Sequence, residues 1–125
     1  MNSKFTKIVR ILLGIILILF GINMFYSFIP LPQPPEKAAN FLNSLADTGY
    51  VLNVVAFFEI FIGLLLLIKK WVPFAMLLLV PISLNILLFH IFLDIPGIGT
   101  AILVIVLNGI LIYKYRQKYR PLFSS

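Results

Sequence analysis

The sequence predicts an all-α protein: a membrane-spanning four-helix bundle with a short amphipathic helix in its first external loop. Of the 125 residues, 62% are hydrophobic and only 11% are charged. A soluble domain of this length cannot bury so much apolar side chain. The apolar residues also form four unbroken blocks, each near the roughly 20 residues that a spanning helix needs. In lipid, backbone polar groups must be hydrogen-bonded within their own segment, so we expect each block to be a helix.

The positive charges predict the topology. Four crossings place nine of the ten Lys and Arg residues on one side of the membrane. These nine are Lys4, Lys7, Arg10, Lys69, Lys70, Lys114, Arg116, Lys118 and Arg120. The positive-inside rule makes this side cytoplasmic, so we expect both termini in the cytoplasm and a multi-pass protein of the cytoplasmic membrane. The net charge of +6 is then a topology signal, and we expect no nucleic-acid partner.

The four spans are predicted at residues 8–29, 50–68, 72–93 and 97–113, within one integral membrane domain covering residues 1–125. The first block is longer than the 7–15 apolar residues of a signal peptide, and no small-residue cleavage site follows it. We therefore expect it to remain as an anchor. The connections KKWVP and DIPG are short enough to make the later spans antiparallel neighbours.

The first external loop is long and begins with the proline-rich stretch LPQPP, which favours extended chain. Pro35 can open a helix at its first position. Apolar residues then recur at helical spacing, which predicts an amphipathic helix over residues 36–46 on the outer leaflet. They are Ala38, Phe41, Leu42 and Leu45. The alternative is a partly ordered loop.

A carboxylate interrupts the second span. In AFFEIFIGLLLLIKK, residues 56–70, Glu59 lies nine residues from Tyr50 and ten from Lys69, which places it about 14 Å from either end. A charged residue at this depth is unfavourable by roughly 2.5–3.5 kcal/mol. The Glu side chain is too short to reach either surface, so we expect it to face protein. Ala56 and Gly63 share its face and allow another helix to approach closely.

Depth suggests partners for Glu59. Asn23 in the first span and Asn85 in the third lie near the same level, which predicts a midplane tier of Asn23, Glu59 and Asn85. Pro81, one turn before Asn85, frees a backbone carbonyl and adds an acceptor. Arg10 lies at the cytoplasmic edge, too distant to pair with Glu59 in a straight bundle.

A second polar tier is predicted nearer the outside, formed by Asn53, His90 and Asp94, with Ser83 on the same helix face as His90. His90 is either a proton carrier or an interfacial residue bonded to Asp94 at i+4. Asn108 falls toward the cytoplasmic half and is expected to be separate. Membrane asparagines also serve as simple interhelical hydrogen bonds, so each Asn has a structural alternative.

Three segments resemble the motifs of the DoxX-like family of small four-helix membrane proteins. They are RILLGIILILFGINMF at 10–25, FFEIFIGLLLLIKKWVP at 57–73 and LVPISLNILLFHIFL at 79–93. The resemblance points to Glu59, Asn85 and His90 as family-like positions. It also implies a link to membrane redox complexes, since the family takes its name from a subunit of a thiosulfate:quinone oxidoreductase, while distant relatives act in secretory-pathway assembly.

The sequence leaves three functions open. The first is an accessory subunit of membrane redox or quinone chemistry, in which a protonated Glu59, aided by Asn85 and Asn23, binds a quinone-like carbonyl and His90 exchanges protons. The second is a scaffold or assembly factor in which Glu59 only holds helices together. The third is a small-solute or proton pathway, which four helices can enclose only as a homo-oligomer.

Other chemistry is not expected. The absence of Cys excludes disulfides, thiolate metal sites and iron–sulfur clusters within one chain. The chain has no phosphate-binding glycine loop, no metal-ligand cluster and no nucleophile–base pair at useful spacing. We therefore expect neither an enzyme acting on its own nor a resident metal or cofactor; a quinone is the ligand that the resemblance implies. The bilayer, a redox partner or further copies of the chain are the expected partners.

Overall fold

The computed structural model describes residues 3–26 and 33–124, and all regular structure in these ranges is helical. Four long helices cross the molecule: α1 (Ser3–Tyr26), α3 (Val51–Ile68), α4 (Val72–Leu93) and α5 (Ile98–Lys114). Each is long and apolar enough to span a membrane, α5 together with the 3₁₀ turn η1 (Ile95–Gly97). The predicted all-α fold class is confirmed. The first helix begins at Ser3 rather than at residue 8, and residues 27–29 of the predicted span lie outside the described residues.

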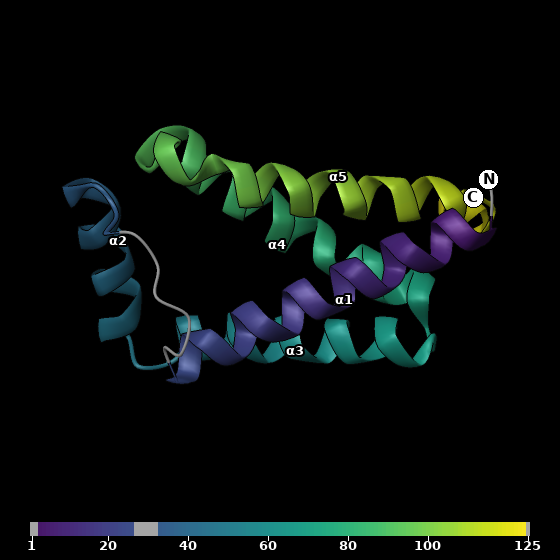
Figure 1. The fold of residues 1–125 in the computed structure, drawn as a ribbon, viewed down its shortest axis with the longest axis horizontal. Coiled ribbons are helices and arrows are strands. Elements are labelled where there is room, and N and C mark those ends of the chain that lie inside the picture. The colour runs from purple at the N-terminus through teal and green to yellow at the C-terminus, as the bar shows by residue number, and fades with distance from the viewer. Residues whose placement is uncertain (1–2, 27–32, 125) are drawn as a thin grey trace.

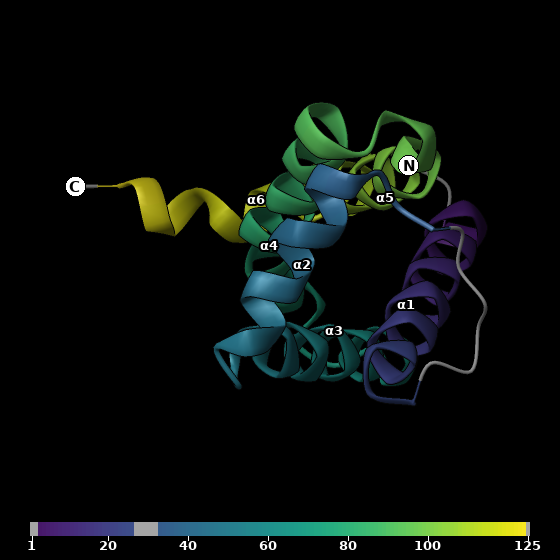
Figure 2. The ribbon, with the colours of Figure 1, turned by 90° about the vertical axis from the view of Figure 1, so that its left-hand side faces the viewer.

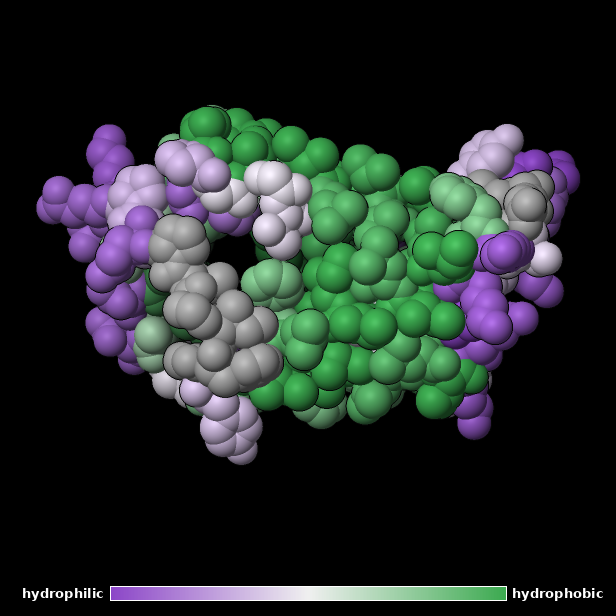
Figure 3. All heavy atoms as spheres, viewed as in Figure 1, coloured by the Kyte–Doolittle hydropathy of each residue, from purple (hydrophilic) through white to green (hydrophobic). Residues whose placement is uncertain are grey.

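The outer surface matches a bilayer. Figure 3 shows hydrophobic residues covering the middle of the molecule, with hydrophilic residues gathered at its two ends. Large apolar side chains along the spans are exposed, including Phe57 at 60%, Phe74 at 51% and Phe92 at 77%. Exposure of this kind is stable only when the surrounding solvent is itself apolar. The chain is therefore a multi-pass membrane protein.

The predicted amphipathic helix is present as α2 (Glu36–Asp47). Its Ala38 is fully buried, and the ring of Phe41 lies 5.9 Å from that of Phe89 near the end of α4. Figure 1 shows α2 lying across the end of the bundle opposite to the two chain termini. The partly ordered loop that was the alternative is not what the structure contains.

The four spans form two pairs. Helix α1 packs along α3 and α4 packs along α5, and the pairs meet through α1–α5 and α3–α4 contacts. The end-on view of Figure 2 shows these helices at four corners, with α2 crossing in front of them. The short connections after α3 and α4 make α3, α4 and α5 successive antiparallel neighbours, as expected.

The apolar core fills only one half of the bundle. The end of the bundle in this half contains the start of α1, the α3–α4 turn and the end of α5. We call it the basic end, because most of the Lys and Arg residues lie there. The core residues are Val9, Leu13, Leu17, Ile62, Leu65, Leu66, Val72, Ala75, Met76, Leu79, Val104, Leu107 and Leu111. On α4 no described residue beyond Ser83 is buried, and on α5 none before Ala101. Accordingly, the α1–α3 and α4–α5 pairs diverge toward α2 in Figure 1.

The α3–α4 turn reverses the chain through two left-handed residues, Lys69 (φ 55°) and Trp71 (φ 54°). The backbone N–H of Lys70 donates to the Leu65 carbonyl at 2.9 Å and closes the end of α3. Trp71 is 59% exposed beside the basic residues, the depth at which indole rings are found in membrane proteins.

After α5 the chain turns into α6 (Arg116–Tyr119) and the 3₁₀ segment η2 (Arg120–Phe123). This tail extends sideways from the bundle in Figure 2. Tyr119 attaches it, because the buried ring places its hydroxyl 2.8 Å from the Pro73 carbonyl, to which it donates. Burial, with a smaller contribution from the charge of Tyr115, raises the pKa of Tyr119 to about 12.

Candidate functional site

Glu59 lies near the middle of α3 and is only 5% exposed. Its side chain therefore faces protein, as its depth predicts. The neighbouring helix is α1: a Cβ atom added to Gly21 would lie 3.3 Å from the Cβ of Glu59. The carboxyl group is thus held beside the α1–α3 interface, at the edge of the apolar core.

Small residues allow α1 to come this close. A Cβ on Gly14 would lie 3.1 Å from the Gly63 carbonyl oxygen, and a Cβ on Gly21 would lie 3.1 Å from that of Ala56. Backbones approach in this way only where neither helix carries a large side chain at the crossing. The pattern noted in the sequence, with Ala56 and Gly63 on the face of Glu59, thus forms a closely packed interface with α1.

The Glu59 carboxyl has an unsatisfied oxygen. Within residues 3–26 and 33–124, its Oε2 atom is buried, has no hydrogen-bond partner and forms no ion pair. A buried polar atom without a partner typically costs 1–3 kcal/mol. Structural polar groups in membrane bundles generally find a partner, so an orphaned carboxyl oxygen suggests a site that a ligand completes.

Of the predicted midplane tier, Asn23 and Glu59 are buried. Asn23 is 7% exposed and lies in α1, two residues after Gly21. Gly21 packs against the turn of α3 that contains Glu59. The structure thus keeps these two residues on the two helices of one closely packed pair.

Asn85 does not join them, and this corrects the predicted tier. The side chain is exposed, and its amide nitrogen donates at 2.8 Å to the Pro81 carbonyl of its own helix. The buried residues of α4 include Met76, Leu79 and Ser83, and a 100° step per residue places Asn85 on the opposite side. The inference that Asn85 shares a buried face with Asn23 and Glu59 was therefore wrong.

The outer tier is also only partly assembled. Asn53, predicted to belong to this tier, is exposed in α3. His90 does contact Asp94: its Nδ1 lies 3.5 Å from Asp94 Oδ2 and 3.1 Å from the Asp94 carbonyl oxygen. Gly97 leaves room for this pair, since a Cβ there would lie 2.8 Å from Asp94 Oδ2.

Ser83 and Asn108 form a buried polar contact that the sequence interpretation missed. Ser83 was predicted on the helix face of His90, and its hydroxyl donates to Asn108 Oδ1 at 3.0 Å. The Asn108 amide in turn donates to the Met76 carbonyl at 3.1 Å, and both side chains are 2% exposed. Each group has its partner, so this contact joins α4 to α5 and leaves nothing for a ligand. Two polar residues within adjacent, antiparallel spans were the available signal.

Arg10 is the second missed residue. It is too far from Glu59 to pair, as expected, but it is 7% exposed, and its Nη1 donates to the Leu66 carbonyl and, at 3.4 Å, to that of Leu67. These carbonyls end α3, where a cation is favourable to the helix dipole. The spacing of Arg10, Gly14 and Gly21 on one face of α1 was the signal that it points inward.

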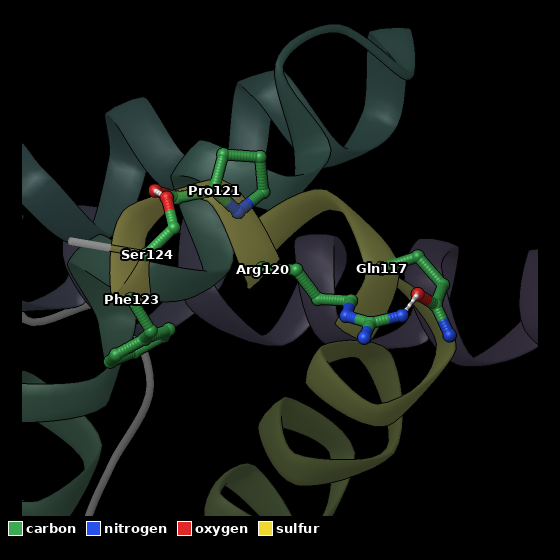
Figure 4. Close-up of a pocket in the computed structure, with 5 residues that line it drawn as sticks. All are labelled: Gln117, Arg120, Pro121, Phe123 and Ser124. Carbon is green, nitrogen blue, oxygen red and sulfur yellow. Dashed lines mark hydrogen bonds between the residues drawn. The ribbon is translucent and has the colours of Figure 1, made fainter.

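Two surface cavities lie near the basic end, and Glu59 lines neither of them. One, of about 610 Å³, is formed by the tail, where Arg120 Nη1 donates to Gln117 Oε1 at 3.2 Å and the Ser124 hydroxyl donates to the Pro121 carbonyl at 2.9 Å (Figure 4). The other, of about 550 Å³, is lined mainly by basic residues. Among residues 3–26 and 33–124, no group of three His, Cys, Asp or Glu side chains is placed to hold a metal ion.

Comparison with protein families gives one match: the family model described as DoxX matches residues 5–91. These residues include α1 through most of α4, with Asn23, Glu59, Asn85 and His90. Comparison with curated proteins and with solved structures gives no match.

Proposed function

The chain belongs to the DoxX family, and from this premise we propose that it is a non-catalytic accessory subunit of membrane redox chemistry that holds a quinone-like ligand at Glu59. The observation that carries the proposal is the buried, unpartnered Oε2 of Glu59. In its neutral form the carboxyl can donate one hydrogen bond to a ligand carbonyl. The surrounding apolar side chains suit a ring with an isoprenoid tail.

The shape of the bundle supports access to this group. The apolar core ends near the level of Glu59, and the two helix pairs diverge from there toward α2 (Figure 1). A flat, apolar ligand arriving from the bilayer would enter between the diverging pairs rather than through the packed core. Asn23, buried on α1, would be the second polar side chain near it.

His90 has a defined place in this proposal. It lies near the end of α4 that is far from the basic end, in contact with Asp94, and its side chain is 17% exposed. An imidazole in contact with a carboxylate can accept and release a proton. We propose that this pair exchanges protons between the ligand and the adjoining aqueous phase.

Binding of a quinone analogue to the purified protein tests the proposal. We expect saturable binding to the wild type and at least tenfold weaker binding to Glu59→Met, which keeps much of the volume but has no hydrogen-bond donor for the ligand carbonyl. Asn85→Gln is the matched control, because it also alters a mid-span polar side chain but one that faces away from the bundle. Absence of saturable binding to the wild type, or equal affinity of all three proteins, would reject a quinone site at Glu59.

A second candidate function is a scaffold or assembly factor, and the position of Asn85 favours it. An amide on the exposed side of α4 is well placed to hydrogen-bond to a helix of another protein, and such contacts guide helix association in membranes. If this is the function, Asn85→Leu reduces recovery of a partner in co-purification while Glu59→Gln does not. The reverse pattern would favour the ligand site.

We also propose that the basic end faces the cytoplasm, because nine basic residues are at that end. Reporter fusions after residue 125 test this orientation. A reporter active only in the cytoplasm should be active there, and one active only outside should not. An active external reporter would reverse the topology.

A further inference from the structure

The basic end is unbalanced in charge. Nine of the ten Lys and Arg side chains belong to it, whereas the four acidic residues lie elsewhere. Glu36 and Asp47 are in α2, Glu59 is within α3, and Asp94 follows α4. None of these acidic side chains lies beside Lys7, Arg10, Lys69 or Lys114, so an anion from outside the chain is a natural counter-charge for these four cations.

These cations surround a defined cavity of about 550 Å³. Three segments far apart in sequence line it: the first turns of α1, the α3–α4 turn and the end of α5. Lys7, Lys69 and Lys114 each come from a different one of these segments. Cationic side chains that converge from several elements on one concave site form a binding site, whereas a solvated surface would spread them apart.

Arg10 forms part of the wall of this cavity and is its most buried cation. Its contacts with the α3 carbonyls both use Nη1. A guanidinium has five N–H donors in a planar fork that matches phosphate oxygens. Among the described residues no carboxylate pairs with Arg10, and a buried cation of this kind is stabilised by an anion.

The cavity lies at the depth of lipid headgroups. Figure 3 shows the hydrophobic surface giving way to hydrophilic residues at this end of the molecule. Tyr115 lines the cavity, and Trp71 and Tyr113 are exposed nearby in sequence, as aromatic residues are at membrane interfaces. The exposed Leu122 and Phe123 give the tail an apolar surface suited to the same interface.

We propose that this cavity binds the phosphate group of an anionic phospholipid, with Arg10, Lys7, Lys69 and Lys114 around the phosphate and the acyl chains along the outside of the bundle. Basic pockets between spans are the sites at which membrane proteins take up anionic headgroups. Binding there would join α1, the α3–α4 turn and α5 through one shared anion and so stabilise the closed end of the bundle.

Lipid titration of the detergent-solubilised protein, followed by native mass spectrometry, tests this site. The probes are phosphatidylglycerol, zwitterionic phosphatidylcholine and inorganic phosphate. We expect phosphatidylglycerol to bind the wild type with a distinct affinity. The double variant Lys7→Gln/Lys114→Gln should bind it about 30-fold more weakly, from roughly fivefold for each lysine near an anionic headgroup. Arg10 is left intact because it also holds the end of α3.

The matched control is Lys70→Gln/Lys118→Gln, which removes the same two charges from the same end but outside the cavity. It should bind within threefold of the wild type. Equal weakening in both double variants would mean diffuse electrostatic attraction and would overturn the site. Binding of phosphatidylcholine as tight as that of phosphatidylglycerol would also overturn a site for an anionic lipid. So would displacement of phosphatidylglycerol by an equal concentration of inorganic phosphate. Loss of quinone binding has no bearing on any of these outcomes.

Discussion

Gly14 and Gly63 face each other across the α1–α3 interface so closely that a Cβ added to Gly63 would lie 2.8 Å from the Gly14 carbonyl oxygen. This contact sets the spacing of the helix pair on which Glu59 lies. The backbone atom cannot move aside as a flexible side chain would. The geometry of the candidate site therefore depends on these two residues, although neither can bind a ligand through a side chain.

Gly63→Ala should destabilise the protein by about 1–3 kcal/mol, because the new methyl group overlaps the α1 backbone and Ile18. Gly109→Ala is the matched control, since a Cβ at Gly109 meets nothing within 4 Å. It should leave stability unchanged or raise it by up to about 1 kcal/mol. Reversible unfolding in mixed micelles, followed by circular dichroism, measures both. Equal stability of the two variants would show that the α1–α3 spacing is not fixed by this contact.

Glu59→Met should leave stability unchanged or increase it by about 1–2 kcal/mol, because it removes a buried oxygen without a partner and keeps the volume. A gain in stability with a loss of ligand binding is the usual pattern for a functional polar group. The same unfolding assay measures the change. A loss of more than about 1 kcal/mol would instead identify Glu59 as a structural contact between helices.

Ser83 and Asn108 should show energetic coupling. Each single substitution to Ala removes their 3.0 Å hydrogen bond, and the double variant shows whether the two effects overlap. Interhelical hydrogen bonds measured this way in a membrane bundle average about 0.6 kcal/mol, so a coupling of about 0.5–1.5 kcal/mol is expected. Additive effects would mean that the contact does not stabilise α4 against α5.

Arg10→Gln should weaken the end of α3 by about 1.5–3 kcal/mol, since a charged donor to the Leu66 carbonyl is lost from a buried position. Arg116→Gln, which also loses a guanidinium bond to a backbone carbonyl but an exposed one, should cost less than about 0.5 kcal/mol. Hydrogen exchange at residues 65–70 locates the effect. Unchanged protection there in Arg10→Gln would contradict the capping role.

Tyr119 predicts a response to alkaline pH. Its pKa rises from 10.0 to about 12 in the folded protein, so the folded state favours the neutral phenol. The stabilising contribution is complete below about pH 10 and is lost between pH 10 and pH 12, as the hydroxyl that donates to the Pro73 carbonyl ionises. Tyrosinate absorbance should show one late-titrating group in the wild type that is missing from Tyr119→Phe. Identical titration curves would place Tyr119 in solvent.

The sequence was sufficient for the fold because composition and block length decide it. Unbroken apolar blocks and the side of the basic residues specify spans and their order without any side-chain contact. The α2 helix followed from its period and from Pro35. The burial of Glu59 followed as well, since the cost of a carboxylate in lipid permits only an inward orientation.

The arrangement of the polar residues could be predicted only in part, because depth and direction are separate coordinates. Depth comes from counting residues, and it placed Asn85 near the level of Glu59. Direction depends on which face of α4 packs against α5, and the contact of Ser83 with Asn108 sets that face and turns Asn85 outward. His90 and Asp94 were predictable because an i, i+4 pair needs only the helix itself.

The apolar core is confined to the half of the bundle near the basic end, and it closes the space between the helices at that end. Leu13, Leu66 and Leu79 are wholly inaccessible there, and a close-packed plug of this kind admits neither water nor a solute. Anything that enters between the helices from the α2 side must leave by the same route. A path through a single chain is consequently blocked at the basic end, and any conduction would have to run along the seams between neighbouring copies.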